Sequence, residues 1–391
     1  MRIETRVAER LKKIHPSLTL AITAKAKQLK SEGYDVVSLA AGEPDFDTPD
    51  FIKAAGIEAI NSGFTKYTPS TGILELRQAI AAKLVKDNCL EYNPSQIVVS
   101  CGAKHSIFNA IFALVGHSDE VLIPSPYWVS YPEMVNLCQG RTRFIKTSAR
   151  NSFKLTSEEL SQHITPKTKL LILNSPSNPS GCVYSRKELE EIAVVCIEKK
   201  IFVISDEIYE KLTYDNLKHV SLGSLNKDIY DQTITVNGLS KSFSMTGWRI
   251  GYLAGPQDIV DAVSKIQDHT TSNPVSISQK AALAAFSAQE DFVKDMLKEF
   301  QKRRDYAVKM LSGIKKIDFI KPQGAFYIFC GIVNTGLGSA DFASRLLEEA
   351  LVGLIPGEGF GRDDYVRISF ATSLSQLEKG MDRLKEWIDK L

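Results

Sequence analysis

Short apolar runs rich in β-branched residues alternate with helix-like segments through the middle of the chain. The runs are IVVS (97–100), EVLIP (120–124), KLLILN (169–174), IFVIS (201–205), TITVN (233–237) and RIGYLAG (249–255). Segments such as HSIFNAIFALV (105–115) and RKELEEIAVVCIEKK (186–200) separate them. Strands this short and this uniformly apolar are typical of a sheet that is covered on both faces. The alternation predicts an α/β fold with a mostly parallel, doubly wound sheet.

The two ends of the chain have a different pattern. The N-terminal end contains a helical arm and one short strand, VVSLA (36–40). The C-terminal end mixes helices and strands, namely QEDFVKDMLKEFQKRRDYAVKML (289–311), AFYIFC (325–330), SADFASRLLEEA (339–350), VRISF (366–370) and SQLEKGMDRLKEWIDKL (375–391). We expect both ends to pack together as a smaller α+β domain. The predicted division is an arm with part of the small domain (1–45), a large domain (46–285) and a small C-terminal domain (286–391).

Composition excludes several classes of protein. The chain has 391 residues, and 48 basic side chains nearly balance 46 acidic ones, which argues against nucleic acid or an anionic membrane as the main partner. No run approaches the roughly 20 apolar residues of a membrane span, and the N-terminus does not look like a signal peptide. The six cysteines form no C-x-x-C pair and no histidine cluster accompanies them. We therefore expect a cytoplasmic protein with reduced thiols and no metal site.

Unusual polar residues follow directly on four of the predicted strands. The segments are Cys101-Gly102-Ala103-Lys104, Ser175-Pro176-Ser177-Asn178-Pro179-Ser180-Gly181, Asp206-Glu207-Ile208-Tyr209 and Gly238-Leu239-Ser240-Lys241. In an open parallel sheet, ligands bind beyond the carboxyl ends of the strands. The sequence therefore predicts that these four segments converge on one crevice.

The residue types in these segments suggest an anionic ligand with a reactive ring. Gly102 to Lys104 open a helix whose free N–H groups can hold a phosphate, or they simply form the turn that starts the helix. Asp206 ends an apolar strand and needs a cationic partner such as a pyridinium nitrogen, unless it caps the next helix. Lys241 can form an imine if it is partly desolvated, or it can be a surface lysine. Arg249 can pair with a phosphate or belong to a structural ion pair.

Around Lys241 the chain resembles a known family. The segment GLSKSFSMTGWRIG (238–251) is similar to the cofactor-lysine signature of class I aminotransferases of fold type I, which use pyridoxal phosphate. Further similar segments, in the family's order, are AGEPDFDTP (41–49), KYTPSTGILELR (66–77), SPYWVSYPEM (125–134), NSPSNPSG (174–181) and SDEIYEKL (205–212). The resemblance spans nearly the whole chain. It implies a pyridoxal-phosphate-dependent aminotransferase whose large domain binds the cofactor.

The resemblance also implies roles for individual residues around the cofactor ring. Lys241 would be the catalytic residue and would hold the cofactor as a Schiff base, while Asp206 would keep the ring nitrogen protonated. Tyr209 and Asn178 would donate hydrogen bonds to the phenolic oxygen. Trp128 would stack on the ring face, which suits its flat apolar surface.

The phosphate would be held at the other end of the cofactor. The amides of Gly102, Ala103 and Lys104 and the side chain of Arg249 would bind it, and Tyr67 would reach it from the neighbouring subunit of a homodimer. Many relatives also use a serine three residues before the lysine. This chain has Gly238 there, so that contact is not expected.

The substrate would be an amino or keto acid. By resemblance, Arg367 in YVRISF would bind the α-carboxylate through its guanidinium fork, unless it forms a strand-edge ion pair. Gly42, Trp128 and Asn178 would line the same site. CGAKHS and SPYWVSYPEM look like the bacterial aspartate and aspartate/prephenate branch, in which the equivalent of Lys104 binds the distal carboxylate.

This branch favours aspartate as amino donor and 2-oxoglutarate as acceptor. Relatives that accept prephenate tend to carry a lysine where this chain has His15, which puts prephenate in doubt. Aromatic or alanine specificity remains an alternative, as does a C–S lyase that uses the same lysine, aspartate and arginine. A transcription regulator would need an added DNA-binding domain, and the glycine run PGEGFG (356–361) has the wrong spacing for a dinucleotide fingerprint.

Overall fold

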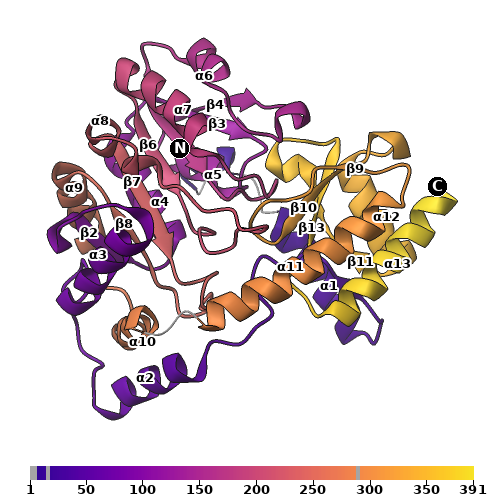
Figure 1. Cartoon of the computed structure of the whole chain (residues 1–391), viewed down its shortest axis with the longest axis horizontal. Helices are drawn as coiled ribbons and strands as arrows, with labels where there is room; N and C mark the ends of the chain where they lie inside the picture. The colour runs from indigo at the N-terminus through magenta and orange to yellow at the C-terminus, as the bar shows by residue number, and fades with distance from the viewer. Residues whose placement is uncertain (1–6, 15–17, 288–290) are drawn as a thin grey trace, which may run out of the picture.

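The computed structural model describes residues 7–14, 18–287 and 291–391. A large sheet with helices on both faces occupies the left and upper part of Figure 1, and a smaller α+β unit lies at the right. The α/β fold class that the sequence predicts is therefore confirmed.

The large sheet has seven strands in the order β2-β8-β7-β6-β5-β3-β4. They are β2 (Ile97–Ser100), β3 (Glu120–Ser125), β4 (Arg141–Lys146), β5 (Thr168–Asn174), β6 (Phe202–Asp206), β7 (Thr233–Gly238) and β8 (Gly251–Ala254). β8 is antiparallel to β7 and to β2, and the other pairs are parallel. Because β8 alone is reversed, β2, β5, β6 and β7 all end at the same edge of the sheet.

Helices cover both faces of this sheet. Because successive side chains of a strand point to opposite faces, they pack in two different core layers. Leu170 and Ile172 of β5 pack in the layer of α4 (Ala103–Leu114), α5 (Ser130–Leu137) and α9 (Gln257–Asp268). Leu171 and Leu173 pack in the layer of α6 (Ser157–His163), α7 (Arg186–Lys199) and α8 (Lys227–Tyr230). A strand buried on both faces must be apolar throughout, which explains the run KLLILN.

Another core layer lies around β2 and β8. It is formed by α2 (Asp50–Asn61), α3 (Leu74–Asn88) and α10 (Ser276–Ser287). Short 3-10 helices complete the chain at η1 (Glu9–Lys13), η2 (Pro94–Gln96), η3 (Ala149–Asn151), η4 (Leu222–Ser224), η5 (Val333–Thr335) and η6 (Gly357–Phe360). Among the helices of the described residues, none combines the length and the apolar character needed to cross a membrane.

The smaller unit joins the two ends of the chain, as the sequence predicts. β1 (Val37–Ser38) pairs in parallel with β11 (Val352–Gly353), and an antiparallel sheet has the order β12-β13-β10-β9. Its strands are β9 (Asp318–Phe319), β10 (Tyr327–Gly331), β12 (Ile355–Pro356) and β13 (Tyr365–Ser369). The surrounding helices are α1 (Leu18–Ser31), α11 (Asp291–Ser312), α12 (Ser339–Ala350) and α13 (Leu374–Lys390). The domain limits at 45/46 and 285/286 stay predictions.

Two details differ from the sequence expectations. The edge strand β4, RTRFIK, was not predicted, because its side chains are mostly exposed and include three basic residues. Charged side chains of this kind protect a sheet edge, but they hide the strand from an apolar pattern. The strand expected from residue 249 begins only at Gly251, since Arg249 has a positive φ of 53°.

Gly251 offers a test of how the fold builds the predicted phosphate turn. A Cβ at Gly251 would overlap the backbone nitrogen of Ala103, at the start of α4. Gly251→Ala should therefore lower the free energy of unfolding by about 1–3 kcal/mol, as overpacking does. Gly247→Ala is the matched control, because a Cβ there meets nothing within 4 Å. Equal urea midpoints for the two variants would contradict this packing.

Candidate active site

The Asp206 carboxylate lies at the carboxyl end of β6, beside Asn174 of β5. Only 4% of this residue is exposed. Burial raises the pKa of Asp206 to about 6, and a hydrogen bond from Tyr131 opposes the rise. The Ile208 amide donates to its other oxygen at 3.2 Å. A buried carboxylate in this state favours a cationic partner.

Tyr131 of α5 is a site residue that the sequence patterns did not single out. Its fully buried hydroxyl donates to Asp206 Oδ2 at 2.6 Å. Its ring meets the Trp128 ring edge to face, with centroids 5.2 Å apart. The available signal was the three-residue spacing from Trp128 in SPYWVSYPEM, which places both side chains on one side of a turn.

The Lys241 side chain, from the loop after β7, approaches Tyr209 and Asp206. Its Nζ donates to the Gly42 carbonyl at 2.5 Å and lies 5.8 Å from the centroid of the Tyr209 ring. Burial lowers the pKa of Lys241 to about 8, against an opposing effect of the Glu43 carboxylate. A lysine in this environment is neutral more often than a surface lysine, so it can act as a nucleophile or base.

Tyr209 lies in the turn after β6, three residues beyond Asp206. Its hydroxyl shares a hydrogen bond of 2.9 Å with the Tyr327 hydroxyl. Both rings are buried, and burial raises the pKa of Tyr209 well above its usual value. Tyr327 is a second contact that the sequence patterns missed, because it lies inside the apolar strand AFYIFC.

Gly102 and Arg249 come together at the start of α4. Gly102 has a φ of 91°, and a Cβ there would lie 2.5 Å from Arg249 Nη2. The guanidinium donates to the carbonyls of Thr246 and Cys101 at 2.8 and 3.3 Å. Among the described residues no carboxylate lies within ion-pair distance of Arg249, which leaves its charge available to an anion. Ala103 is the first residue of α4, so its amide is one of the free N–H groups at a helix N-terminus.

Arg367 and Asn178 are brought together from the two sheets. Arg367 of β13 is 2% exposed and donates to Asn178 Oδ1 at 3.0 Å and to the Ala40 carbonyl at 3.1 Å. Its Cζ lies 4.2 Å from the centroid of the Tyr327 ring. Arg367 Nε is buried without a hydrogen-bond partner. A buried guanidinium with a free donor and no carboxylate partner among the described residues suits an anionic ligand.

Three further residues named in the sequence analysis lie in different surroundings. Lys104 is an exposed residue whose Nζ lies 5.0 Å from the centroid of the Trp128 ring, and partial desolvation of this amine and the charge of Arg249 lower its pKa. Tyr67 is 91% exposed, as a residue that serves another subunit would be. Gly238 is buried, and a Cβ there would lie 3.0 Å from the Ile250 carbonyl, so a serine would be crowded. His15 lies outside the described residues.

Taken together, the site combines a buried carboxylate, a lysine of lowered pKa, a helix N-terminus with an arginine, and a buried second arginine. This constellation on a doubly wound sheet is typical of enzymes that act on anionic small molecules beside a reactive lysine. The family model for aminotransferase class I and II matches residues 34–384. The chain therefore belongs to the class I and II aminotransferases.

Relatives of known name agree across nearly the full length. The chain is 48% identical to the aspartate aminotransferase of Bacillus sp. (strain YM-2), over 98% of this chain and 99% of that protein. It is 45% identical to the "Probable aspartate/prephenate aminotransferase" of Aquifex aeolicus, over 98% and 99% of the two chains. The solved structure of the Thermus thermophilus aspartate aminotransferase with maleate matches with a TM-score of 0.94 and 39% identity, over 98% and 99%.

The pH dependence of stability tests the state of Asp206 in the cofactor-free protein. Its folded pKa of about 6 exceeds the value in the unfolded chain, so the native state holds this proton more tightly. The stabilisation is complete at low pH and is lost as pH rises through the folded pKa. Relative to Asp206→Asn, wild type should therefore lose about 3 kcal/mol of unfolding free energy between roughly pH 4 and 7. A difference that stays flat in urea titrations would refute the assignment.

Proposed function

We propose that this protein is a pyridoxal-phosphate-dependent aspartate aminotransferase. It transfers the amino group of L-aspartate to 2-oxoglutarate, giving oxaloacetate and L-glutamate with ping-pong kinetics. One observation carries the proposal: the half-buried Lys241 and the buried Asp206 lie close enough for their charges to interact, and their pKa values are shifted to about 8 and about 6. Opposite shifts of an amine and a carboxylate toward neutral pH are typical of catalytic sites.

The residues present fit pyridoxal phosphate at each end. The Arg249 guanidinium lies so close to Gly102 that a Cβ at this position would collide with it. Among the described residues no carboxylate pairs with this guanidinium, so it can pair with a phosphate. The amides of Gly102, Ala103 and Lys104 would donate to the same phosphate. Asp206 would face the ring nitrogen, Trp128 the ring, and Tyr209 and Asn178 the phenolic oxygen.

The chain's own groups account for the proton movements. When bound, the cofactor supplies a protonated pyridine ring that withdraws electrons from the α-carbon of an attached amino acid. Asp206 holds the proton on that ring nitrogen, and Tyr131 and the Ile208 amide fix the two carboxylate oxygens. Lys241 removes the α-proton and returns it, because an amine with a pKa of about 8 is partly neutral near physiological pH.

Arg367 and Lys104 would select a dicarboxylic substrate. Arg367 would bind the α-carboxylate through its planar fork, beside Gly42 and Asn178. Lys104 would pair with the distal carboxylate. The aspartate aminotransferases among the relatives support this substrate. An aromatic or alanine substrate would leave Lys104 without a distal carboxylate, whereas prephenate specificity would depend on the position of His15.

The active unit is a homodimer in this proposal. Tyr67 is 91% exposed, so its side chain is not packed into a site of its own chain. In the dimer its hydroxyl would donate to the phosphate bound by the partner subunit. Charge balance and the lack of a membrane-spanning helix among the described residues support a cytoplasmic enzyme without nucleic-acid partners.

Replacement of Lys241 tests the proposed chemistry. Reconstituted wild type should bleach its cofactor absorbance with aspartate and regain it with 2-oxoglutarate. Lys241→Ala should lose nearly all turnover, at least about 1,000-fold, since it lacks the proton-transferring amine. Lys294→Ala, an exposed lysine of α11, is the control. Full activity of Lys241→Ala would contradict the mechanism. Release of many equivalents of keto acid per site from a sulfur-containing amino acid, without an acceptor, would favour the C–S lyase.

Replacement of Arg367 tests substrate binding. Arg367→Lys keeps the charge but loses the planar fork, so kcat/KM for aspartate should fall at least about tenfold, mainly through a higher KM. Arg383→Lys, on α13 beside Asp35, should leave both constants unchanged. Steady-state kinetics with an unchanged KM for Arg367→Lys would place the α-carboxylate elsewhere.

A further inference from the structure

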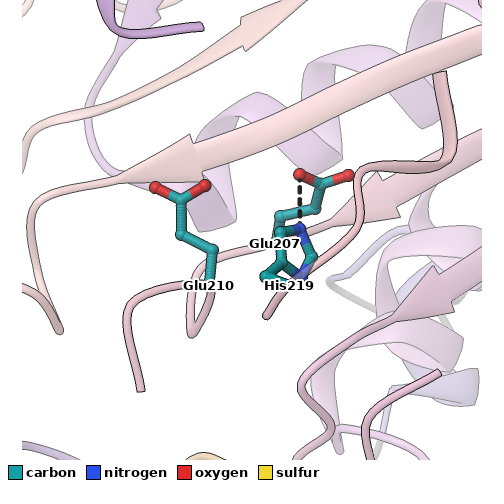
Figure 2. A group of neighbouring side chains, drawn as sticks. All are labelled: Glu207, Glu210 and His219. Carbon is teal, nitrogen blue, oxygen red and sulfur yellow. Dashed lines mark hydrogen bonds and ion pairs between the residues drawn. The ribbon is translucent and has the colours of Figure 1, made fainter. Parts of the chain in front are cut away.

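The turn after β6 has two faces with different polar surroundings. Asp206 and Tyr209 face the crevice, and Glu207 and Glu210 face the opposite side, where both are buried. Successive strand residues point to opposite faces, and residues three apart in a tight turn lie on the same side. Figure 2 shows Glu207, Glu210 and His219 gathered on this second face.

Glu207 is held by a dense set of donors. Its Oε1 accepts from Ser205 Oγ at 2.8 Å. Its Oε2 accepts from Ser221 Oγ at 2.5 Å and lies 2.9 Å from His219 Nε2, the contact dashed in Figure 2. The residue is 1% exposed, so its carboxylate has exchanged water for these fixed partners.

Asn88, the last residue of α3, links the two carboxylates. Its Nδ2 donates to Glu210 Oε2 at 2.7 Å and approaches Glu207 Oε2 at 3.3 Å. Lys83, on the same helix, forms an ion pair with Glu210 Oε1. Helix α3 therefore contacts the turn through the Asn88 amide and the Lys83 ammonium group.

The same contacts argue against a metal ion at this cluster. Ligand atoms of Glu207, Glu210 and His219 lie within 4.8 Å of one another. However, the Asn88 amide already donates to both carboxylates, and Lys83 neutralises Glu210. A divalent cation would have to displace an N–H donor and approach an ammonium group, so the cluster is better described as a hydrogen-bonded clamp.

The clamp also acts on the crevice electrostatically. The negative charge of Glu207 raises the pKa of Asp206, in the same direction as burial does. The two carboxylates belong to adjacent residues, and the low dielectric of the interior screens them weakly. Loss of this carboxylate should therefore weaken proton binding by Asp206 and by a cofactor ring held beside it.

We propose that Glu207 and Asn88 are positioning residues that hold Asp206 and Tyr209 from the side opposite the proposed cofactor, and that the Glu207 carboxylate contributes to the electrostatics of the site. Neither residue is placed to touch substrate or cofactor. Asn88 fixes the turn through Glu210 and Glu207, and Glu207 lies next to Asp206 in the chain. The inference rests on the proposed function, because it assigns Asp206 to the cofactor ring.

The electrostatic part is tested in the holoenzyme with Glu207→Gln. The pH midpoint of the absorbance change of the lysine-bound cofactor should fall by at least about 0.3 unit, since one nearby negative charge is removed. Glu120→Gln is the control, because this buried carboxylate lies at the first residue of β3, at the opposite end of the sheet. A midpoint equal to that of wild type would overturn the electrostatic role.

The positioning part is tested in the cofactor-free protein with Asn88→Leu, which keeps the side-chain volume but removes the donors. Hydrogen exchange of the amides of residues 206–212 should become at least about tenfold faster, because local opening is easier. Amides of β3 serve as the internal reference. Unchanged exchange would overturn the clamp. This arm needs no cofactor, so failure of wild type to bind pyridoxal phosphate would count only against the proposed function.

Discussion

A carboxylate buried at the end of an apolar strand is the constraint on which the site depends. The Asp206 side chain is buried from solvent, and among the described residues its carboxylate accepts hydrogen bonds from two donors, the Tyr131 hydroxyl and the Ile208 amide. Two neutral donors do not offset the desolvation of an ion, so burial raises the pKa of Asp206 to about 6. The folded chain therefore contains a buried acidic group that a cation would stabilise, and in the proposed function a protonated pyridine ring would be that cation.

The fold limits which ligand can bind beside Asp206, because it groups several other charged or polar residues around it. Parallel strands of the large sheet deliver Asp206, Lys241 and Gly102 to one edge, although they are far apart in sequence. The smaller sheet adds Arg367, whose buried Nε lacks a partner, from the other side of the crevice. A ligand that satisfies all of these groups must carry a cation at one point and anions at two others, as a pyridoxal phosphate with an attached amino acid does.

Much of this could be predicted from the sequence, for physical reasons. Strands buried on both faces must be uniformly apolar, so the sequence predicts β2, β3, β5, β6 and β7. The polar residues that follow four of these strands predict the site. β4 was missed because its exposed basic side chains conceal the strand from an apolar pattern, whereas β2, at the other edge of the sheet, is covered by helices and is apolar. Tyr131 and Tyr327 were missed because a buried tyrosine looks like core until its hydroxyl partner is known. The network of Glu207 likewise depends on Asn88 and Ser221, whose approach only the folded chain reveals.

The central claim is that Asp206 faces a protonated ring nitrogen. The most direct measurement is the ¹⁵N NMR chemical shift of pyridoxal phosphate labelled at that nitrogen and bound to the wild-type protein. The account predicts the shift of a protonated pyridine at neutral pH, and the shift of an unprotonated one in Asp206→Ala. An unprotonated nitrogen in wild type, or the same shift in both proteins, would contradict it.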